Sequence, residues 1–153
     1  MTRSAALAAP LLGGAARVAV GVLWLLEGLE KYRAGFGASD ILLVADGAAR
    51  TPRTPWWFSP LDAGMQAFPA LFGFVIPALE VALGLLLIAG LFTRLAALAS
   101  IATLMLYWSS DQLVDQYPVM VLLSAVVLAV PGAGRYGVGM LRRHRTRIAA
   151  PQK

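Results

Sequence analysis

The chain has 153 residues, of which 59% are hydrophobic and only 14% charged, and its mean hydropathy is +0.71. Because a soluble domain carries about a quarter charged residues, this chain lacks the polar surface to cover itself in water, and a single all-α membrane domain is expected over residues 1–153. The chain has no cysteine, and its single histidine, His144, lies in a basic tail, so we expect no metal, haem or iron–sulfur cluster.

Four apolar segments predict a bundle of four transmembrane helices, at about residues 10–32, 68–91, 94–108 and 114–130. A membrane-spanning helix needs about 20 residues, so the third segment requires a thinned bilayer. The alternative for the first segment is a signal peptide. Arg17 interrupts its apolar run, however, and no small-residue cleavage site follows, which favours a helix that is retained.

The first segment carries charges near its outer end. At 100° per residue, Arg17, Gly21, Trp24, Gly28 and Lys31 share one face. Glu27 lies next to this face on the helix surface. It precedes Lys31 by four residues, which is the favourable order for an ion pair. Arg17 lies about 21 Å below Lys31, at 1.5 Å per residue. The segment therefore predicts a polar patch near the outer membrane surface.

Residues 33–67 are expected to form a loop outside the membrane. The stretch "TPRTPWWFSP", residues 51–60, contains three adjacent aromatic residues, beginning with Trp56. We expect it to lie on the membrane surface, and a cover over the polar patch or a docking surface for a partner is the alternative.

The second segment places Glu80 about halfway along its length. A carboxylate at that depth costs a few kcal/mol, at least about 2.5, and such groups usually face the bundle interior and find a partner. Lys31 and Arg17 are the candidate partners, and the depth of Lys31 favours it. Gly73 and Gly84 on the same stripe as Glu80 are expected to let the first helix approach closely.

Two interpretations of Glu27, Lys31 and Glu80 remain open. One is an interhelical ion pair that fixes packing. The other is an outward-facing small-molecule site in which Glu80 or Glu27 exchanges protons and Lys31 holds an anionic or carbonyl oxygen. Tyr107 and Tyr117, at the outer ends of the third and fourth segments, are either interfacial aromatics or a surface on which a quinone ring stacks.

The charges predict the orientation of the bundle. Basic residues precede the first segment, occupy the turn between the second and third, and follow the fourth: Arg3, Arg94, Arg135, Arg142, Arg143, Arg145, Arg147 and Lys153. The acids of the two connecting loops are on the other side: Asp40, Asp46, Asp62, Asp111 and Asp115. Both termini are therefore expected in the cytoplasm of a multi-pass plasma-membrane protein, with residues 135–153 as a basic tail. Basic residues directly after the last helix are typical of a segment that contacts anionic lipid and fixes the topology, so nucleic-acid binding is not expected.

The segments "RVAVGVLWLLEGLEKY", "PWWFSP", "ALEVALGLLLIAGLFTRLAAL" and "PGAGRYG" resemble the DoxX/DoxD family of membrane proteins along nearly the whole chain. The markers of this resemblance are Arg17, Gly21, Gly28, Lys31, Glu80, Gly84, Gly90, Thr93 and Arg94. The Pro55–Trp56 pair is similar to the DoxD-like branch, the small subunit of thiosulfate:quinone oxidoreductase. The family's Leu-Asp pair after the final arginine is replaced here by Val138 and Gly139.

The resemblance implies a membrane subunit of a quinone-linked oxidoreductase system, with quinone as cofactor and other membrane or extracytoplasmic subunits as partners beside the bilayer lipid. In this hypothesis Glu80, Lys31 and Glu27 are the catalytic residues, and Arg17, Trp24, Tyr107, Tyr117 and Trp56 bind the ligand. The alternative is a non-catalytic subunit that anchors a larger respiratory complex. A small-solute permease is a third possibility, which four helices without matching broken pairs do not favour.

Overall fold

The computed structural model describes residues 3–138, and within them all regular secondary structure is helical. In chain order the elements are α1 (Arg3–Ala34), α2 (Ala38–Arg50), the short 3-10 helix η1 (Trp56–Phe58), α3 (Ser59–Ala67), α4 (Pro69–Ala89), α5 (Thr93–Ser109) and α6 (Tyr117–Ala129). The predicted basic tail lies mostly outside the described residues, and nothing tests it.

Helices occupy all four predicted apolar segments. The first begins seven residues earlier than expected, at Arg3 rather than residue 10, and the other boundaries differ by three residues or fewer. Within the described part of the chain, two stretches are long and apolar enough to cross a membrane, Ala8–Ala34 and Pro69–Ala89. The helices α5 and α6 are shorter, at 17 and 13 residues. The number of spans therefore stays a prediction.

The segment expected to be a loop, 33–67, instead contains α2, η1 and α3. The helix α2 starts where the Asp40 carboxylate accepts a hydrogen bond from the Gly37 N–H at 2.9 Å. Its buried residues Ile41, Ala45 and Ala48 recur at helical spacing and pack with Phe58 and Met65 in a hydrophobic cluster separate from the main core. The sequence interpretation missed this amphipathic periodicity because short helices between glycine and proline residues resemble a loop. We call α2, η1 and α3 together the lid.

Glycines bring α1 and α4 into backbone contact. A Cβ atom on Gly84 would lie 2.7 Å from the Leu25 nitrogen and 2.8 Å from the Gly21 carbonyl oxygen. A Cβ on Gly28 would lie 2.9 Å from the Pro77 carbonyl oxygen. Close approach at these positions is as predicted, but Gly73 was misassigned: it packs against Gly37, at the start of the lid, and not against α1.

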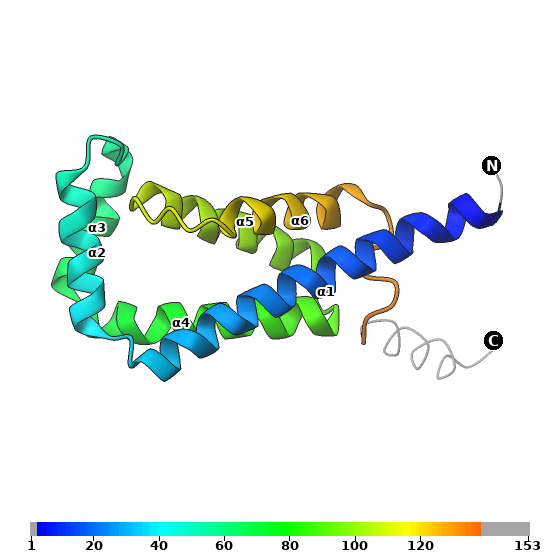
Figure 1. Ribbon diagram of the computed structural model, residues 1–153, viewed down its shortest axis with the longest axis horizontal. Helices are drawn as coiled ribbons and strands as arrows, with labels where there is room; N and C mark the ends of the chain where they lie inside the picture. The colour runs from blue at the N-terminus through cyan, green and yellow to red at the C-terminus, as the bar shows by residue number, and fades with distance from the viewer. Residues whose placement is uncertain (1–2, 139–153) are drawn as a thin grey trace, which may run out of the picture.

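Figure 1 shows the lid standing across one end of the bundle, with α5 and α6 along one side and α4 along the other. At the opposite end of the bundle, the residues that follow α6 pack against α1 and against the end of α4. Ala133 packs against Gly13 of α1, and the Val138 N–H donates to the Ala89 carbonyl at 2.8 Å. The start of α1 and the residues after α6 therefore lie at the same end, which is the arrangement that four antiparallel spans require.

Candidate functional site

The site is centred on Glu80, a fully buried residue of α4. Its Oε1 atom accepts a hydrogen bond from Lys31 Nζ of α1 at 2.8 Å and another from the Tyr107 hydroxyl of α5 at 2.6 Å. The second oxygen, Oε2, is buried and has no hydrogen-bond partner among the residues that the structure describes. Since a buried polar atom without a partner costs about 1–3 kcal/mol, this oxygen is the point at which the site is incomplete.

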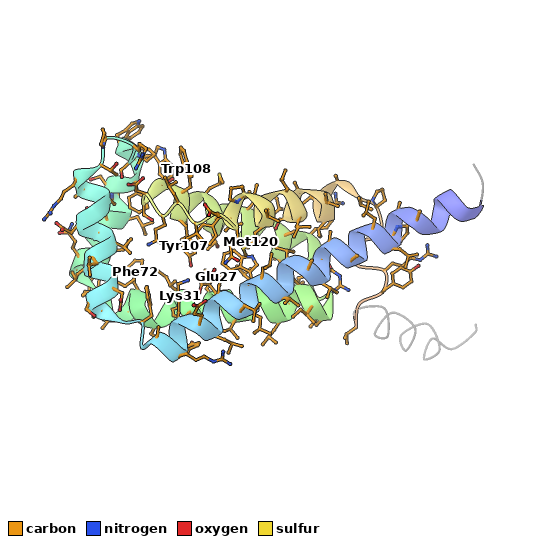
Figure 2. The ribbon with its side chains drawn as sticks, in the orientation of Figure 1. Glu27, Lys31, Phe72, Tyr107, Trp108 and Met120 are labelled. Carbon is orange, nitrogen blue, oxygen red and sulfur yellow. The ribbon has the colours of Figure 1, made fainter. Side chains whose placement is uncertain are left out.

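Lys31 joins two carboxylates. Its Nζ atom also lies 3.1 Å from Glu27 Oε2, one turn earlier in α1, and the other oxygen of Glu27 accepts a hydrogen bond from the Gln116 side chain. Glu80 thus contacts Lys31, the partner that depth favoured, and not Arg17. With both acids ionised the group carries two negative charges and one positive charge. We call Glu27, Lys31, Glu80, Tyr107 and Gln116 the Glu80 cluster; Figure 2 labels Glu27, Lys31 and Tyr107, which face one another inside the bundle.

Aromatic and hydroxyl side chains lie on the inner side of the Glu80 cluster. The Tyr107 ring lies 5.6 Å from the Tyr117 ring and 6.2 Å from the Trp24 ring, between centroids. The Trp24 indole nitrogen donates to Ser100 Oγ at 2.7 Å, and Ser100 Oγ lies 2.8 Å from Ser124 Oγ. These contacts tie α1, α5 and α6 together and fix the Tyr107 ring by edge-to-face packing.

A cavity of about 170 Å³ lies between the lid and the bundle. Its polar lining residues include Lys31, Tyr107, Ser110 and Gln112, and the other lining residues are almost all apolar, from the lid, the connection before it, α4 and α5. Three of them, Val75, Leu79 and Leu106, are exposed on the outer faces of α4 and α5. The cavity, which we call the lid cavity, therefore reaches from the ammonium of Lys31 to the side of the bundle.

Lys31 also lines a second hollow, of about 140 Å³. This hollow is acidic: its lining includes Glu27, Glu30 and Asp40. Glu30 is exposed, so the acidic hollow connects the Glu80 cluster with the outside of the bundle. Lys31 and Phe36 line both spaces, and Lys31 is the charged residue of the two.

An ion pair fastens the lid to the turn between α5 and α6. The Arg53 guanidinium donates from Nε to Asp111 Oδ1 at 2.9 Å and from Nη2 to Oδ2 at 3.0 Å. This bidentate contact holds the pKa of Asp111 below its usual value, and the same contact raises the pKa of Arg53. Asp111 adopts a positive φ of 63°, a backbone conformation that asparagine and aspartate tolerate better than most residues.

The structure brings together six of the eight proposed site residues: Glu80, Lys31, Glu27, Trp24, Tyr107 and Tyr117. Arg17 is separate. It is buried at the other end of the bundle, and its guanidinium donates to the Leu87 and Ile88 carbonyl oxygens at the end of α4. Trp56 is also separate, because it is 88% exposed on η1 and does not line the lid cavity. Both were grouped with the site from sequence alone, by helix face and by composition.

Sequence reasoning missed Gln116, the two serines below Tyr107 and the apolar residues that the lid contributes. The hydrophobic spacing of α2 was the one available signal for the lid. Gln116 gave no signal, because its contact with Glu27 joins residues 89 positions apart.

Comparison with known families assigns the chain. The DoxX family profile matches residues 14–110, which is more than half of the 153 residues, and the chain belongs to this family. Neither the curated proteins nor the solved structures that were compared gave a match. Family membership and the two long apolar helices together identify a membrane protein.

Proposed function

We propose that this DoxX-family protein spans the membrane four times, through α1, α4, α5 and α6, with both termini in the cytoplasm. The helix α4 has 21 residues and a length of about 31 Å, which matches the hydrocarbon core of a bilayer. The helix α6 has 13 residues, and the apolar Val130 follows it directly. All five aspartates lie at the lid end of this arrangement and Arg94 and Arg135 at the other, which supports the orientation.

We further propose that the protein is the quinone-binding subunit of an oxidoreductase system, with the quinone ring in the lid cavity. The observation that carries this proposal is the shape and chemistry of the cavity: apolar walls, polar lining residues that include Lys31 and Tyr107, and a side formed by exposed residues of α4 and α5. Such a side faces lipid in the proposed topology, so an isoprenoid tail leaves through it.

The size of the lid cavity limits what enters. Its volume of about 170 Å³ is below the roughly 300–1,000 Å³ of typical ligand pockets, so it admits a ring and not a whole lipid-soluble molecule. The residues present fit a quinone, because its carbonyl oxygens accept hydrogen bonds and the Lys31 ammonium has a third N–H besides the two donated to Glu27 and Glu80. The unpartnered Glu80 oxygen adds an acceptor for a proton.

A bound quinone supplies a two-electron, two-proton carrier, and the electrons come from a partner subunit. In this proposal Lys31 donates a hydrogen bond to a carbonyl oxygen and stabilises negative charge there. Tyr107 lines the cavity and donates to Glu80, so it connects the cavity with a carboxylate that does not line it. Glu80 and Glu27 hold and release protons, and the acidic hollow beyond Glu27 links them to the outside.

The test is extraction and mass spectrometry of quinone from the protein purified in mild detergent. The parent is expected to retain near-stoichiometric quinone, and Lys31→Met combined with Glu80→Gln is expected to lose it. The pair of changes removes the ammonium and the fully buried carboxylate together, so no charge is left at position 80, while the partly exposed Glu27 keeps its hydrogen bond from Gln116. The control is Arg33→Met, which replaces an exposed basic residue of α1 two positions after Lys31. A folded double variant that keeps the parent's quinone content would reject the proposal.

A second function, that of an anchoring subunit without chemistry of its own, is favoured by the outer surface of the lid. Trp56 is 88% exposed and Leu43 73%. Exposed apolar side chains of this size mark membrane contacts or partner interfaces. Stoichiometric co-purification of a second protein that is lost on Trp56→Ala, with no quinone in the parent, would establish this function in place of the first.

A further inference from the structure

A second region of interest lies at the end of the bundle opposite the lid. It is an open groove of about 750 Å³ between two segments, residues 90–95 around the turn from α4 to α5 and residues 127–135 at the end of α6. Neither the Glu80 cluster nor the lid contributes to it, and the proposed quinone chemistry does not use it. We call it the basic groove.

Two arginines line the basic groove, and no acid does. Arg94 and Arg135 are both exposed, and neither has a carboxylate within 4 Å in the part of the chain from residue 8 to residue 138. Arg94 makes one long hydrogen bond, 3.4 Å from Nη2 to the Leu128 carbonyl oxygen, which leaves most of its donors available. The groove therefore presents two largely unneutralised positive charges.

The guanidinium of Arg17 places a third positive charge close to the lining of the groove. Gly90 lines the groove, and a Cβ atom added to it would lie 2.8 Å from a guanidinium nitrogen of Arg17. Because Arg17 donates only to backbone carbonyls, no carboxylate cancels its charge. The positive charge of Arg17 therefore adds to the electrostatic attraction of the basic groove for anions, although Arg17 does not line the groove.

The walls of the basic groove are apolar. Phe92 is 72% exposed and Leu95 is 66% exposed on the α5 side, and Val127, Leu128 and Val130 come from the α6 side. A free inorganic anion gains nothing from such walls, whereas a phospholipid places its phosphate on the arginines and its acyl chain along the apolar side chains. Basic pockets between transmembrane helices bind anionic lipid headgroups in this way.

We propose that the basic groove is a binding site for an anionic phospholipid, with the headgroup phosphate held by Arg94 and Arg135 and an acyl chain along Phe92 and Leu95. The lipid then connects the turn between α4 and α5 with the end of α6. It joins the two halves of the bundle at the end where the lid is absent.

The experiment is native mass spectrometry of the full-length protein in mild detergent, titrated with phosphatidylglycerol or with phosphatidylcholine. The parent is expected to bind the anionic lipid more tightly. Arg94→Gln with Arg135→Gln is expected to weaken that binding about 30-fold, because each interfacial arginine contributes about fivefold. The matched control is Arg33→Gln with Arg50→Gln, which removes two exposed positive charges at the lid end and is expected to leave binding unchanged. All three proteins keep residues 139–153, so the basic tail contributes equally to each.

Three outcomes would overturn the proposal. Equal binding of the two lipids by the parent, or equal weakening by both pairs of changes, would mean that the groove does not recognise the headgroup. A third arm measures the thermal unfolding midpoint with inorganic phosphate alone. If phosphate stabilises the parent as much as phosphatidylglycerol does, the groove is an anion site and the acyl chain plays no part, which also rejects the proposal.

Discussion

The two ends of the bundle bury charge in different ways. At the lid end, Glu80 is paired with Lys31 and Tyr107, side chains that can rotate, exchange partners or transfer a proton. At the other end, Arg17 is held by two backbone carbonyl oxygens of α4, which can do none of these things. Lys31 and Arg17 lie on one face of α1 in the sequence pattern. The difference between the two ends teaches that Lys31 belongs to an adjustable site and Arg17 to the scaffold.

The largest effect that would sharpen this comparison comes from Lys31→Met. It leaves the buried Glu80 carboxylate beside Glu27 without a cation, and we expect a loss of about 3 kcal/mol in the free energy of unfolding. Glu80→Gln is expected to lower the free energy of unfolding by less, because Lys31 keeps its ion pair with Glu27. The double variant should recover most of the loss. Chemical unfolding in detergent of the two single variants and the double variant measures the coupling, and additive costs would show that the residues do not interact.

The next effect tests the contact between α1 and α4. Gly84→Ala places a Cβ atom 2.7 Å from the Leu25 backbone nitrogen, where no flexible side chain can yield. We expect a loss of about 1–3 kcal/mol in stability and a disturbed Glu80 cluster, because the two helices must separate. The matched control is Gly47→Ala on the exposed face of α2, where nothing lies within 4 Å. Alanine there should stabilise the helix by up to about 1 kcal/mol. A thermal unfolding midpoint that falls equally for both would contradict the packing argument.

A smaller effect is expected at the ion pair that fastens the lid. Arg53→Gln should raise amide hydrogen exchange several-fold in α2 and α3 and leave α1 and α4 unchanged, because only the lid is released. Since Arg53 holds the pKa of Asp111 below its usual value of about 4, the contact stabilises the lid fully above that pH. The stabilisation is lost as the pH falls through the lowered pKa of Asp111. High salt screens exposed ion pairs and should have the same effect as the variant. If amide hydrogen exchange in the lid changes neither in Arg53→Gln nor at high salt, the contact does not hold the lid.

The smallest effect is expected for Trp56→Ala. Its side chain is 88% exposed and does not line the lid cavity, so stability should change by less than about 0.5 kcal/mol and quinone retention should not change. Phe58→Ala, two residues later, removes a ring that is 1% exposed, and the loss should be about 3 kcal/mol or more. Equal effects of the two changes would mean that the lid is not packed as described.

The sequence was informative where a local physical rule applied. Long apolar segments located α1 and α4, and helical spacing with membrane depth selected Lys31 over Arg17 as the partner of Glu80. It was uninformative where the contact depends on tertiary packing. No rule of spacing brings Gln116 to Glu27 or Arg53 to Asp111, and the lid cavity exists only because short helices, mistaken for a loop, fold over the bundle.

The burial of Trp24 gives the protein an optical reporter. Trp56, Trp57 and Trp108 are exposed, whereas Trp24 is fully buried beside Tyr107. A water-soluble quencher such as iodide, together with brominated lipid, will reach the exposed indoles and leave the Trp24 emission. The residual fluorescence then comes from a chromophore whose neighbour lines the lid cavity, so the occupancy of that cavity is readable without attaching a label.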